Sequence, residues 1–230
     1  MADPQPSCVV LGVGPGLGAS VARRFARAGY AVAVAARDAY KLTDLVKEIE
    51  IAGGRAMAYR CDAVSEKDVI ELFDHAERDL GPAAVAVFNA SGRVRKPIAE
   101  IECQEFVDAW MRGCFGGFLL GREAARRMTP RGRGSILFTG ATASMKGYAN
   151  SAGFAVPKFG LRGLAESMAR ELGPKGLHVA HFVIDGGIGR AEDDSRLDPD
   201  AIAETYFQTH AQPRSAWSFQ IELRPAAEKF

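Results

Sequence analysis

Hydrophobic and polar positions alternate in blocks along this chain of 230 residues. Short apolar runs of strand length are each followed by a stretch with apolar residues at helical spacing, and glycine, proline or asparagine separates the blocks. The apolar runs predict strands at residues 8–11, 31–36, 56–61, 83–88, 135–139, 177–184 and 219–223, the last at a sheet edge. Because strands and helices alternate, the pattern predicts one twisted, mostly parallel α/β sheet with helices on both faces.

The helical stretches between these runs have recognisable ends. They cover residues 19–28, 42–52, 65–80, 98–128, 152–172 and 199–210. Ser65 with Asp68 three residues later predicts the start of one helix, and Gly173 followed by Pro174 predicts the end of another. Pro157 is expected near a first helical turn, because a proline deeper in a helix breaks it.

Composition narrows the class of protein. With 47% hydrophobic and 25% charged residues, and no repeat or linker, we expect residues 1–230 to form one domain. The net charge of +1 gives no argument for nucleic acid or an anionic membrane, so a small molecule is the expected partner. No signal peptide or membrane span is apparent. The four cysteines lack C-x-x-C spacing, so we expect reduced, buried thiols in a cytoplasmic protein.

The candidate chemistry starts at the turn after the first strand. Four glycines, Gly12, Gly14, Gly16 and Gly18, connect this strand to the first helix, with Leu17 between the last two. Glycines let the backbone turn sharply and approach a ligand, and a helix N-terminus offers unpaired N–H groups to a pyrophosphate. The stretch therefore predicts a dinucleotide site, with an ordinary strand-to-helix turn as the alternative.

Polar residues follow the later strands at their carboxyl ends, where open parallel sheets bind ligands. An arginine after the second strand can take a 2′-phosphate, so Arg37 points to NADP(H) over NAD(H); the alternative is a solvated arginine beside Asp38. Asp62 is a candidate adenine contact or an ordinary turn former. The residues expected to line the cofactor after these strands are Arg37, Asp62, Ala63, Asn89, Ala90, Ser91, Gly186 and Ile188.

Other candidate groups are less specific. His178 and His181 lie three apart on a predicted strand, so they face opposite sides and form no metal pair; we expect hydrogen-bonded histidines within the sheet. Arg93, Arg95 and Lys96 form a basic loop that is either solvated or holds a phosphate or an anionic substrate. The sequence has no Gly-x-Ser-x-Gly elbow or His-Glu-x-x-His motif, which excludes common hydrolase and metalloprotease classes.

Over nearly its whole length the chain resembles the short-chain dehydrogenase/reductases. The stretch Gly12-x-x-x-Gly16-Leu17-Gly18 is similar to that family's glycine motif, and Asn89-Ala90-Ser91-Gly92 is similar to its Asn-Asn-Ala-Gly turn. Asp62 lies where the family's adenine-contacting aspartate would. The resemblance implies a Rossmann fold of about seven strands, a homodimer or homotetramer, and hydride transfer between NAD(P) and a carbonyl or alcohol.

The resemblance also implies a catalytic set of Asn, Ser, Tyr and Lys, the last two spaced Tyr-x-x-x-Lys. Residues four apart share a helix face, and a lysine ammonium lowers the pKa of a nearby phenol. Here Lys158 is present, while Phe154, Ala141 and Gly113 occupy the other three positions. Because the family's lysine also binds the nicotinamide ribose, we expect Lys158 in the cofactor site, with a surface lysine as the alternative.

These substitutions leave two hypotheses. Loss of a general acid typically lowers a rate by roughly 10²- to 10⁴-fold. The first hypothesis is an NADP(H)-dependent oxidoreductase with an altered proton route, acting on a small carbonyl, alcohol, imine or activated alkene. Thr142 and Tyr148 are possible substitutes for the tyrosine, as are Ser144 and Ser151. The second is a catalytically inactive NADP(H)-binding sensor or supporting subunit. Substrate contacts are expected from residues 91–96, 145–149 and 187–197.

Overall fold

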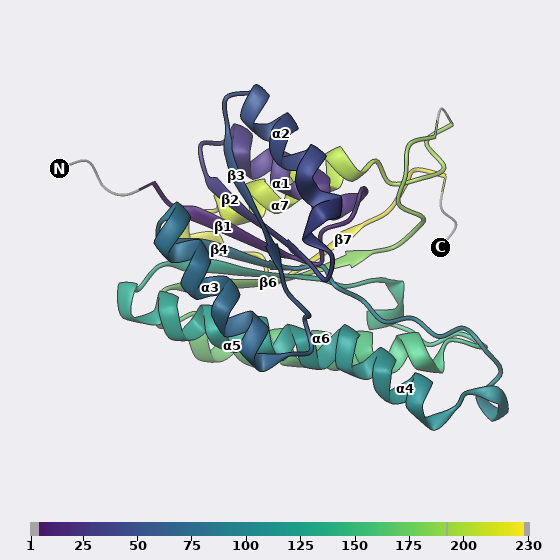
Figure 1. The fold of residues 1–230 in the computed structure, drawn as a ribbon. Coiled ribbons are helices and arrows are strands. Elements are labelled where there is room, and N and C mark those ends of the chain that lie inside the picture. Colours follow the sequence, from purple (N-terminus) through teal and green to yellow (C-terminus); the bar gives the residue numbers. More distant parts are fainter. Residues whose placement is uncertain (1–4, 192, 228–230) are drawn as a thin grey trace.

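Seven strands form one sheet, in the order β3-β2-β1-β4-β5-β6-β7, in the computed structural model, which describes residues 5–191 and 193–227 (Figure 1). Every neighbouring pair is parallel, so the sheet is fully rather than mostly parallel. The strands are β1 (Ser7–Leu11), β2 (Ala31–Ala36), β3 (Arg55–Arg60), β4 (Ala83–Phe88), β5 (Gly134–Thr139), β6 (Leu177–Ile184) and β7 (Gln220–Leu223). The expected edge position of the last strand is confirmed.

The order of the strands creates a crevice at the centre of the sheet. From β1 the chain moves outward through β2 to β3, and it then returns to the other side of β1 and runs outward again from β4 to β7. Where the direction reverses, the helices leaving β1 and β4 go to opposite faces. In open α/β sheets the ligand crevice lies at this point, beyond the carboxyl ends of the strands.

Helices cover both faces of the sheet, as predicted. Figure 1 shows α1, α2 and α7 on one face and α3, α5 and α6 on the other, with α4 at the end of the second layer. Their bounds are α1 (Leu17–Arg27), α2 (Thr43–Ile51), α3 (Glu66–Leu80), α4 (Cys103–Trp110), α5 (Gly116–Met128), α6 (Ala152–Leu172) and α7 (Pro199–His210). Ser65 caps α3 as expected: its hydroxyl oxygen accepts a hydrogen bond from the backbone N–H of Asp68 at 3.2 Å.

The sheet is buried on both sides, which explains why its strands read as continuous apolar runs. Along β1, Val9 and Leu11 belong to the core under α3, α5 and α6, whereas Cys8 and Val10 belong to the core under α1, α2 and α7. Successive side chains thus enter the two cores alternately. This packing fixes the register of the central strands, and with it the relative position of the loops at their carboxyl ends.

The stretch 98–128, whose sequence pattern is helical with interruptions, is not one continuous helix. It is divided into a short 3-10 turn (Ile98–Glu100), α4, a wider π-helical turn (Met111–Phe115) and α5. Pro157 is the sixth residue of α6, so the expectation of a first-turn position is wrong. Its ring packs beside Gly113, where a Cβ would lie 2.8 Å from the proline Cβ. The π turn and this proline therefore lie face to face.

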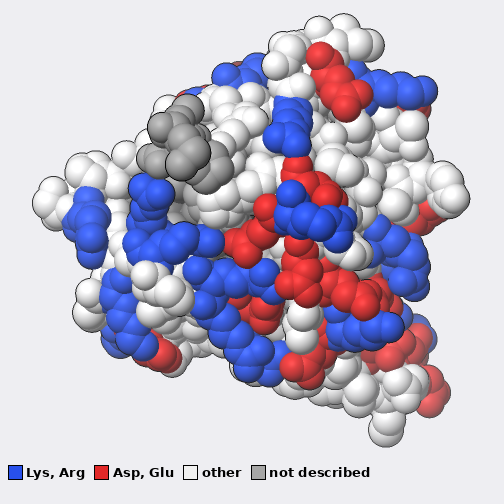
Figure 2. All heavy atoms as spheres, turned by 60° about the vertical axis from the view of Figure 1, so that its left-hand side comes forward, with Lys and Arg blue, Asp and Glu red and all other residues white. Residues whose placement is uncertain are grey.

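The surface away from the crevice carries charges of both signs. Figure 2 shows Lys and Arg side chains interleaved with Asp and Glu on the face that lies to the left in Figure 1. Among them, Arg127 of α5 pairs with Glu77 and Asp74 of α3 at 2.9 and 2.7 Å. This network ties the two helices together.

The cysteines are free thiols. Cys8, Cys61 and Cys114 are buried as expected, but Cys103 is exposed because it begins the surface helix α4.

Candidate active site

The glycine turn between β1 and α1 performs two different tasks. Gly12 has φ +93°, and a Cβ there would lie 2.3 Å from the backbone nitrogen of Ala90, so only glycine fits. A Cβ on Gly18 would lie 2.9 Å from the Cα of Val13. Gly14 and Gly16, by contrast, face open space. The outer glycines therefore permit close packing, and the inner two leave room for a ligand.

The N-terminus of α1 opens into the same space. Its N-cap residue is Gly16, no side chain caps the helix, and its first turn holds no acidic residue. Unpaired backbone N–H groups and the helix dipole together favour an anion at such an end. The 11-residue helix thus provides a phosphate site that its own side chains leave open.

Asn89 connects the turn to the other side of the crevice. Its backbone nitrogen donates to the carbonyl of Leu11 at 2.8 Å, and its side-chain Nδ2 donates to the carbonyl of Gly12 at 2.9 Å. These bonds hold the ends of β1 and β4 together. The crevice is therefore rigid where the two halves of the sheet meet.

Two adjoining hollows lie along the carboxyl ends of the strands, and they share Asn89 and Ser91. Many of the expected cofactor residues line the hollow of about 270 Å³. They are Gly12, Gly14, Arg37, Asp62, Ala63, Asn89, Ala90 and Ser91. The hollow of about 940 Å³ is lined by Gly16, Leu17, Asn89, Ser91, Lys158, Gly186 and Ile188. The structure therefore brings all the expected cofactor residues together except Gly18, which packs inside the turn.

Arg37 lies at the outer end of the smaller hollow. It is exposed, and it forms no hydrogen bond or ion pair with any other residue in the described ranges. Asp38 does not pair with it: its side chain accepts from the backbone N–H of Tyr40 at 3.2 Å and pairs with Lys41 at 3.6 Å. The guanidinium group is therefore available to a ligand.

Asp62 lines the smaller hollow and also shapes its own turn. One carboxylate oxygen accepts from the backbone N–H of Val64 at 3.3 Å. Its backbone N–H donates to Asp68 at 3.0 Å. The interpretation of Asp62 as a turn former is confirmed, and its contact with the adenine stays a prediction.

Lys158 is buried at the floor of the larger hollow. Its side chain is 3% exposed, and Nζ donates to the backbone carbonyl of Thr139 at 2.7 Å. Burial removes water from the ammonium group and lowers the pKa of Lys158 to about 8. The surface-lysine alternative is therefore wrong. A lysine with this pKa remains mostly protonated at neutral pH and can exchange its proton.

The three substituted positions surround Lys158. Phe154 and Ala141 line the larger hollow, and the Phe154 ring centroid lies 5.9 Å from Lys158 Nζ. Gly113 lies behind them, against Pro157. Phenylalanine, alanine and glycine carry no side-chain proton to give, so none of these three side chains can act as a proton donor.

The two suggested substitutes differ in position. Tyr148 lines the larger hollow at its mouth and is 51% exposed. Thr142 also lines it, but its hydroxyl donates to the Oδ1 atom of Asp185. The remaining candidates are engaged elsewhere: Ser144 accepts from the backbone of Ala141, and Ser151 donates to the carbonyl of Tyr148.

Asp185 is a site residue that the sequence interpretation missed. It lines the larger hollow, and Arg224, just beyond β7, donates to its Oδ2 atom at 2.8 Å. Burial alone would raise the pKa of Asp185, but the hydrogen bonds from Thr142 and Arg224 and the charge of Arg224 lower it, so the carboxylate is ionised. Its position directly after β6, like that of Asp62 after β3, was the signal available in the sequence.

The two histidines of β6 differ in their hydrogen bonding. No group of three or more potential metal ligands is present in residues 5–191 and 193–227. His178 Nε2 donates to the backbone carbonyl of Ser218 at 2.8 Å. Within the same ranges both ring nitrogens of His181 lack a hydrogen-bond partner, so the expectation of a hydrogen-bonded histidine is wrong there. Desolvation, with the nearby charges of Lys158 and Arg162, lowers its pKa to about 3 and keeps it neutral.

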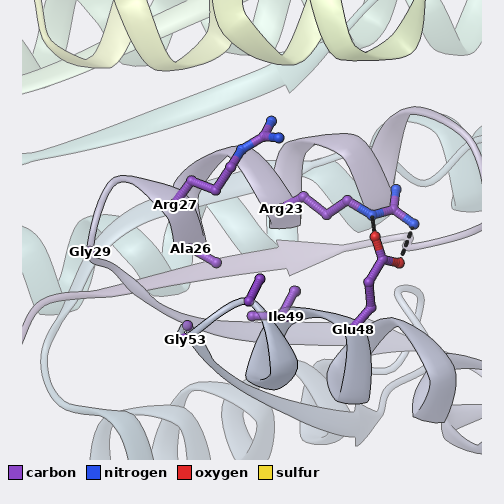
Figure 3. A pocket seen from close by; sticks show the side chains of 9 residues that line it. Arg23, Ala26, Arg27, Gly29, Glu48, Ile49 and Gly53 are labelled. Carbon is purple, nitrogen blue, oxygen red and sulfur yellow. Dashed lines mark hydrogen bonds and ion pairs between the residues drawn. The ribbon is translucent and has the colours of Figure 1, made fainter.

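A separate hollow of about 350 Å³ lies between α1 and α2, at the opposite, amino ends of the strands (Figure 3). Arg23 donates two hydrogen bonds to Glu48, at 2.8 and 2.9 Å, while Arg27 extends away from that carboxylate. The described residues that line it include none of the candidate site residues. Arg23 and Glu48 thus pair with each other within this hollow.

No helix formed by the described residues is both long and apolar enough to cross a bilayer.

Known proteins share the sequence pattern and the fold of this chain. A family model described as short chain dehydrogenase matches residues 7–191. A short-chain dehydrogenase from Rhodopseudomonas palustris has a crystal structure 43% identical in sequence, with a TM-score of 0.88 over 96% of this chain and 100% of that one. A metagenomic short-chain oxidoreductase in complex with NADP is 27% identical, with a TM-score of 0.86 over 98% of this chain and 100% of that one. The 7alpha-hydroxysteroid dehydrogenase of Escherichia coli K12 is 33% identical over 171 residues, which are 74% of this chain and 67% of the relative.

Proposed function

Because this chain belongs to the short-chain dehydrogenase family, we propose that it binds NADP(H) in the two hollows and transfers hydride to or from a small carbonyl, alcohol, imine or activated alkene. One observation carries the proposal: the open glycine turn, the uncapped end of α1 and the unpaired Arg37 lie along one crevice. The relative that contains NADP has the same fold. Residues 1–230 would then act as one dinucleotide-binding domain.

Each part of the cofactor has a matching set of residues. The end of α1 would hold the pyrophosphate, Arg37 the 2′-phosphate, and Asp62 with Ala63 the adenine. Lys158, at the floor of the larger hollow, would contact the nicotinamide ribose. When bound, NADP(H) supplies or accepts the hydride. The preference for NADP(H) over NAD(H) rests on Arg37 alone.

The proton route in this proposal differs from the usual one. Phe154 cannot donate a proton, and the hydroxyl hydrogen of Thr142 is used by Asp185. Lys158, with a pKa of about 8, is the buried group that can hold and release a proton near neutral pH. Tyr148, at the mouth of the hollow, is the hydroxyl that faces solvent. A substrate that needs no strong acid, such as an imine or activated alkene, suits this arrangement.

The substitutions also favour a second candidate function. A protein that binds NADP(H) without turnover, as a sensor or a supporting subunit, would keep the glycine turn, Arg37 and Lys158. It would not need catalytic side chains at the positions of Phe154, Ala141 and Gly113. The two functions share cofactor binding and differ in catalysis.

Two measurements test the proposal. Titration with NADPH and NADH by isothermal calorimetry tests cofactor binding, and no binding of either would contradict both functions. The absorbance of NADPH is then followed with panels of carbonyls, imines and activated alkenes. Consumption on any of them excludes the binding-only function, whereas binding without consumption on any panel favours it.

A homodimer or homotetramer is part of the same proposal. Trp110 of α4, Phe118 of α5 and Phe159 of α6 are 38%, 37% and 42% exposed. Figure 1 shows these three helices in one layer on the same side of the sheet. Large apolar side chains gathered on one face are typical of protein interfaces. We infer that a second copy of the chain covers this face.

A further inference from the structure

Two arginines lie on the substrate side of the larger hollow. Arg93 and Arg95, from the loop after β4, both line it. The guanidinium carbon of Arg93 lies 5.1 Å from the ring centroid of Phe154, which holds the arginine against the ring. Phe154 occupies the position at which the family resemblance places the substrate-facing tyrosine. Arg93 is therefore positioned where the reacting part of a substrate would lie.

Neither arginine has a protein partner for its charge. Within residues 5–191 and 193–227, Arg93 and Arg95 form no hydrogen bond or ion pair. Their neighbours do: Lys96 of the same loop pairs with Glu105 at 2.5 Å, and Arg112 pairs with Asp108 at 3.3 Å. The basic residues of this loop therefore differ from one another. Arg93 and Arg95 face the hollow and have no acidic partner among the described residues, whereas Lys96 has one.

The other charged groups around the hollow do not neutralise them. Asp185 is the one carboxylate among its described lining residues, and Thr142 and Arg224 already bind its two oxygens. Lys158 adds a third cation at the floor. A ligand in this hollow therefore meets an excess of positive charge with guanidinium donors at the mouth.

The geometry points to an anionic substrate. Resting on the proposed function, we infer that the compound oxidised or reduced here carries a carboxylate or phosphate-type group, and that Arg93 and Arg95 bind its oxygens. A guanidinium group presents paired N–H donors that match such oxyanions. The phosphates of the cofactor are assigned to the end of α1 and to Arg37, so they do not occupy these two donors.

Matched ligands test this inference. Benzoylformate carries a carboxylate and benzoylphosphonate a phosphonate beside the same aryl ketone, whereas methyl benzoylformate is neutral. Each is titrated by calorimetry into protein saturated with NADP⁺. We expect the wild-type protein to bind at least one anion more tightly than the ester. Arg93→Gln and Arg95→Gln should each lower the affinity for that anion by about 10-fold. They should change the affinity for the ester by less than about 2-fold. Arg133→Gln is the control, since this exposed arginine precedes β5 and lines neither hollow.

Three outcomes overturn the inference. One is that neither anion binds the wild-type protein more tightly than the ester. Another is an unchanged anion affinity in both glutamine variants, whose folding is checked by thermal melting. The third is a loss of NADP⁺ affinity in these variants, which would assign the arginines to the cofactor. If NADP⁺ does not bind wild-type protein at all, the proposed function fails instead. The same titrations on the cofactor-free protein, whose hollow already holds both arginines, then decide the anion question separately.

Discussion

Gly113 lies against Pro157, so that a Cβ added to the glycine would come within 2.8 Å of the proline Cβ. The glycine belongs to the π-helical turn Met111–Phe115, and the proline directly precedes Lys158 in α6. The missing asparagine and the unusual proline are therefore one local arrangement. An asparagine at this position does not fit while the proline is present.

The first prediction concerns this pair. Gly113→Asn should lower the free energy of unfolding by about 1–3 kcal/mol, because it overpacks the contact with Pro157. In a Pro157→Gly background, which removes the contacting Cβ, the same change should cost less than about 1 kcal/mol, which a double-mutant cycle in urea would measure. Gly163→Asn, where a Cβ meets open space in α6, is the control and should not destabilise. Equal costs in the two backgrounds would show that the contact does not matter.

Restoring the missing acid gives the second prediction. Phe154→Tyr, combined with Ala141→Ser, should raise NADPH turnover by roughly 10²- to 10⁴-fold, because it places a hydroxyl beside Lys158. Phe154→Leu is the control, since it changes the ring without adding a proton donor. Steady-state NADPH consumption is the measurement. A doubly substituted protein that binds NADPH but remains inactive would mean that the hollow lacks more than these two hydroxyl groups.

Burial of Lys158 predicts a specific dependence of stability on pH. Its pKa is about 8 in the folded protein and roughly 10.4 in an unfolded chain. At a pH between these two pKa values the unfolded state binds more protons than the folded state. The free energy of unfolding of the wild-type protein therefore increases as the pH rises. Relative to Lys158→Met, the wild-type free energy of unfolding should therefore increase by up to roughly 3 kcal/mol from pH 7 to pH 11. Urea unfolding of both proteins at each pH is the test, and a constant difference would disprove it.

The fourth prediction concerns the choice of cofactor. Arg37→Glu should weaken NADPH binding by at least about 10-fold and NADH binding by less than about 3-fold, because only NADPH has the 2′-phosphate. Calorimetric titration of both nucleotides provides the comparison, with Arg133→Glu as a charge-matched control. Equal weakening of the two nucleotides would refute the assignment of Arg37.

Assembly gives the fifth prediction. The protein should elute with the mass of a dimer or tetramer in light scattering, and Trp110→Glu should shift it toward the monomer by placing a charge in the apolar face. Ile51→Glu is the matched control, because Ile51 is 88% exposed at the end of α2, away from this face. A monomeric wild-type protein would contradict the proposal.

The fold could be predicted because its determinants are local. Strands such as 31–36 and 83–88 and the helix 152–172 have the predicted bounds, since buried parallel strands and amphipathic helices leave clear periodic patterns. The family resemblance is confirmed by the match over residues 7–191. The close contact between Gly113 of the π turn and Pro157 was not predictable, because the two residues are distant in sequence.

The site was predictable to the extent that it follows strand ends. The residues after β1, β2, β3 and β4 were placed along the crevice by topology alone. The partner of Asp185 was not, because Arg224 reaches it from beyond the last strand and no spacing rule relates the two positions. The unpaired state of Arg93 and Arg95 also depends on which acids fold nearby.

The contact between Thr142 and Asp185 sets the polarity of one wall of the hollow. A hydroxyl has one hydrogen, and an ionised carboxylate accepts it here, so the lone pairs of the Thr142 oxygen are what remain for a ligand. That wall complements an O–H or N–H hydrogen and repels a bare carbonyl oxygen. At this wall, a ligand alcohol or amine, which has a hydrogen to donate, therefore fits better than the carbonyl compound formed by its oxidation.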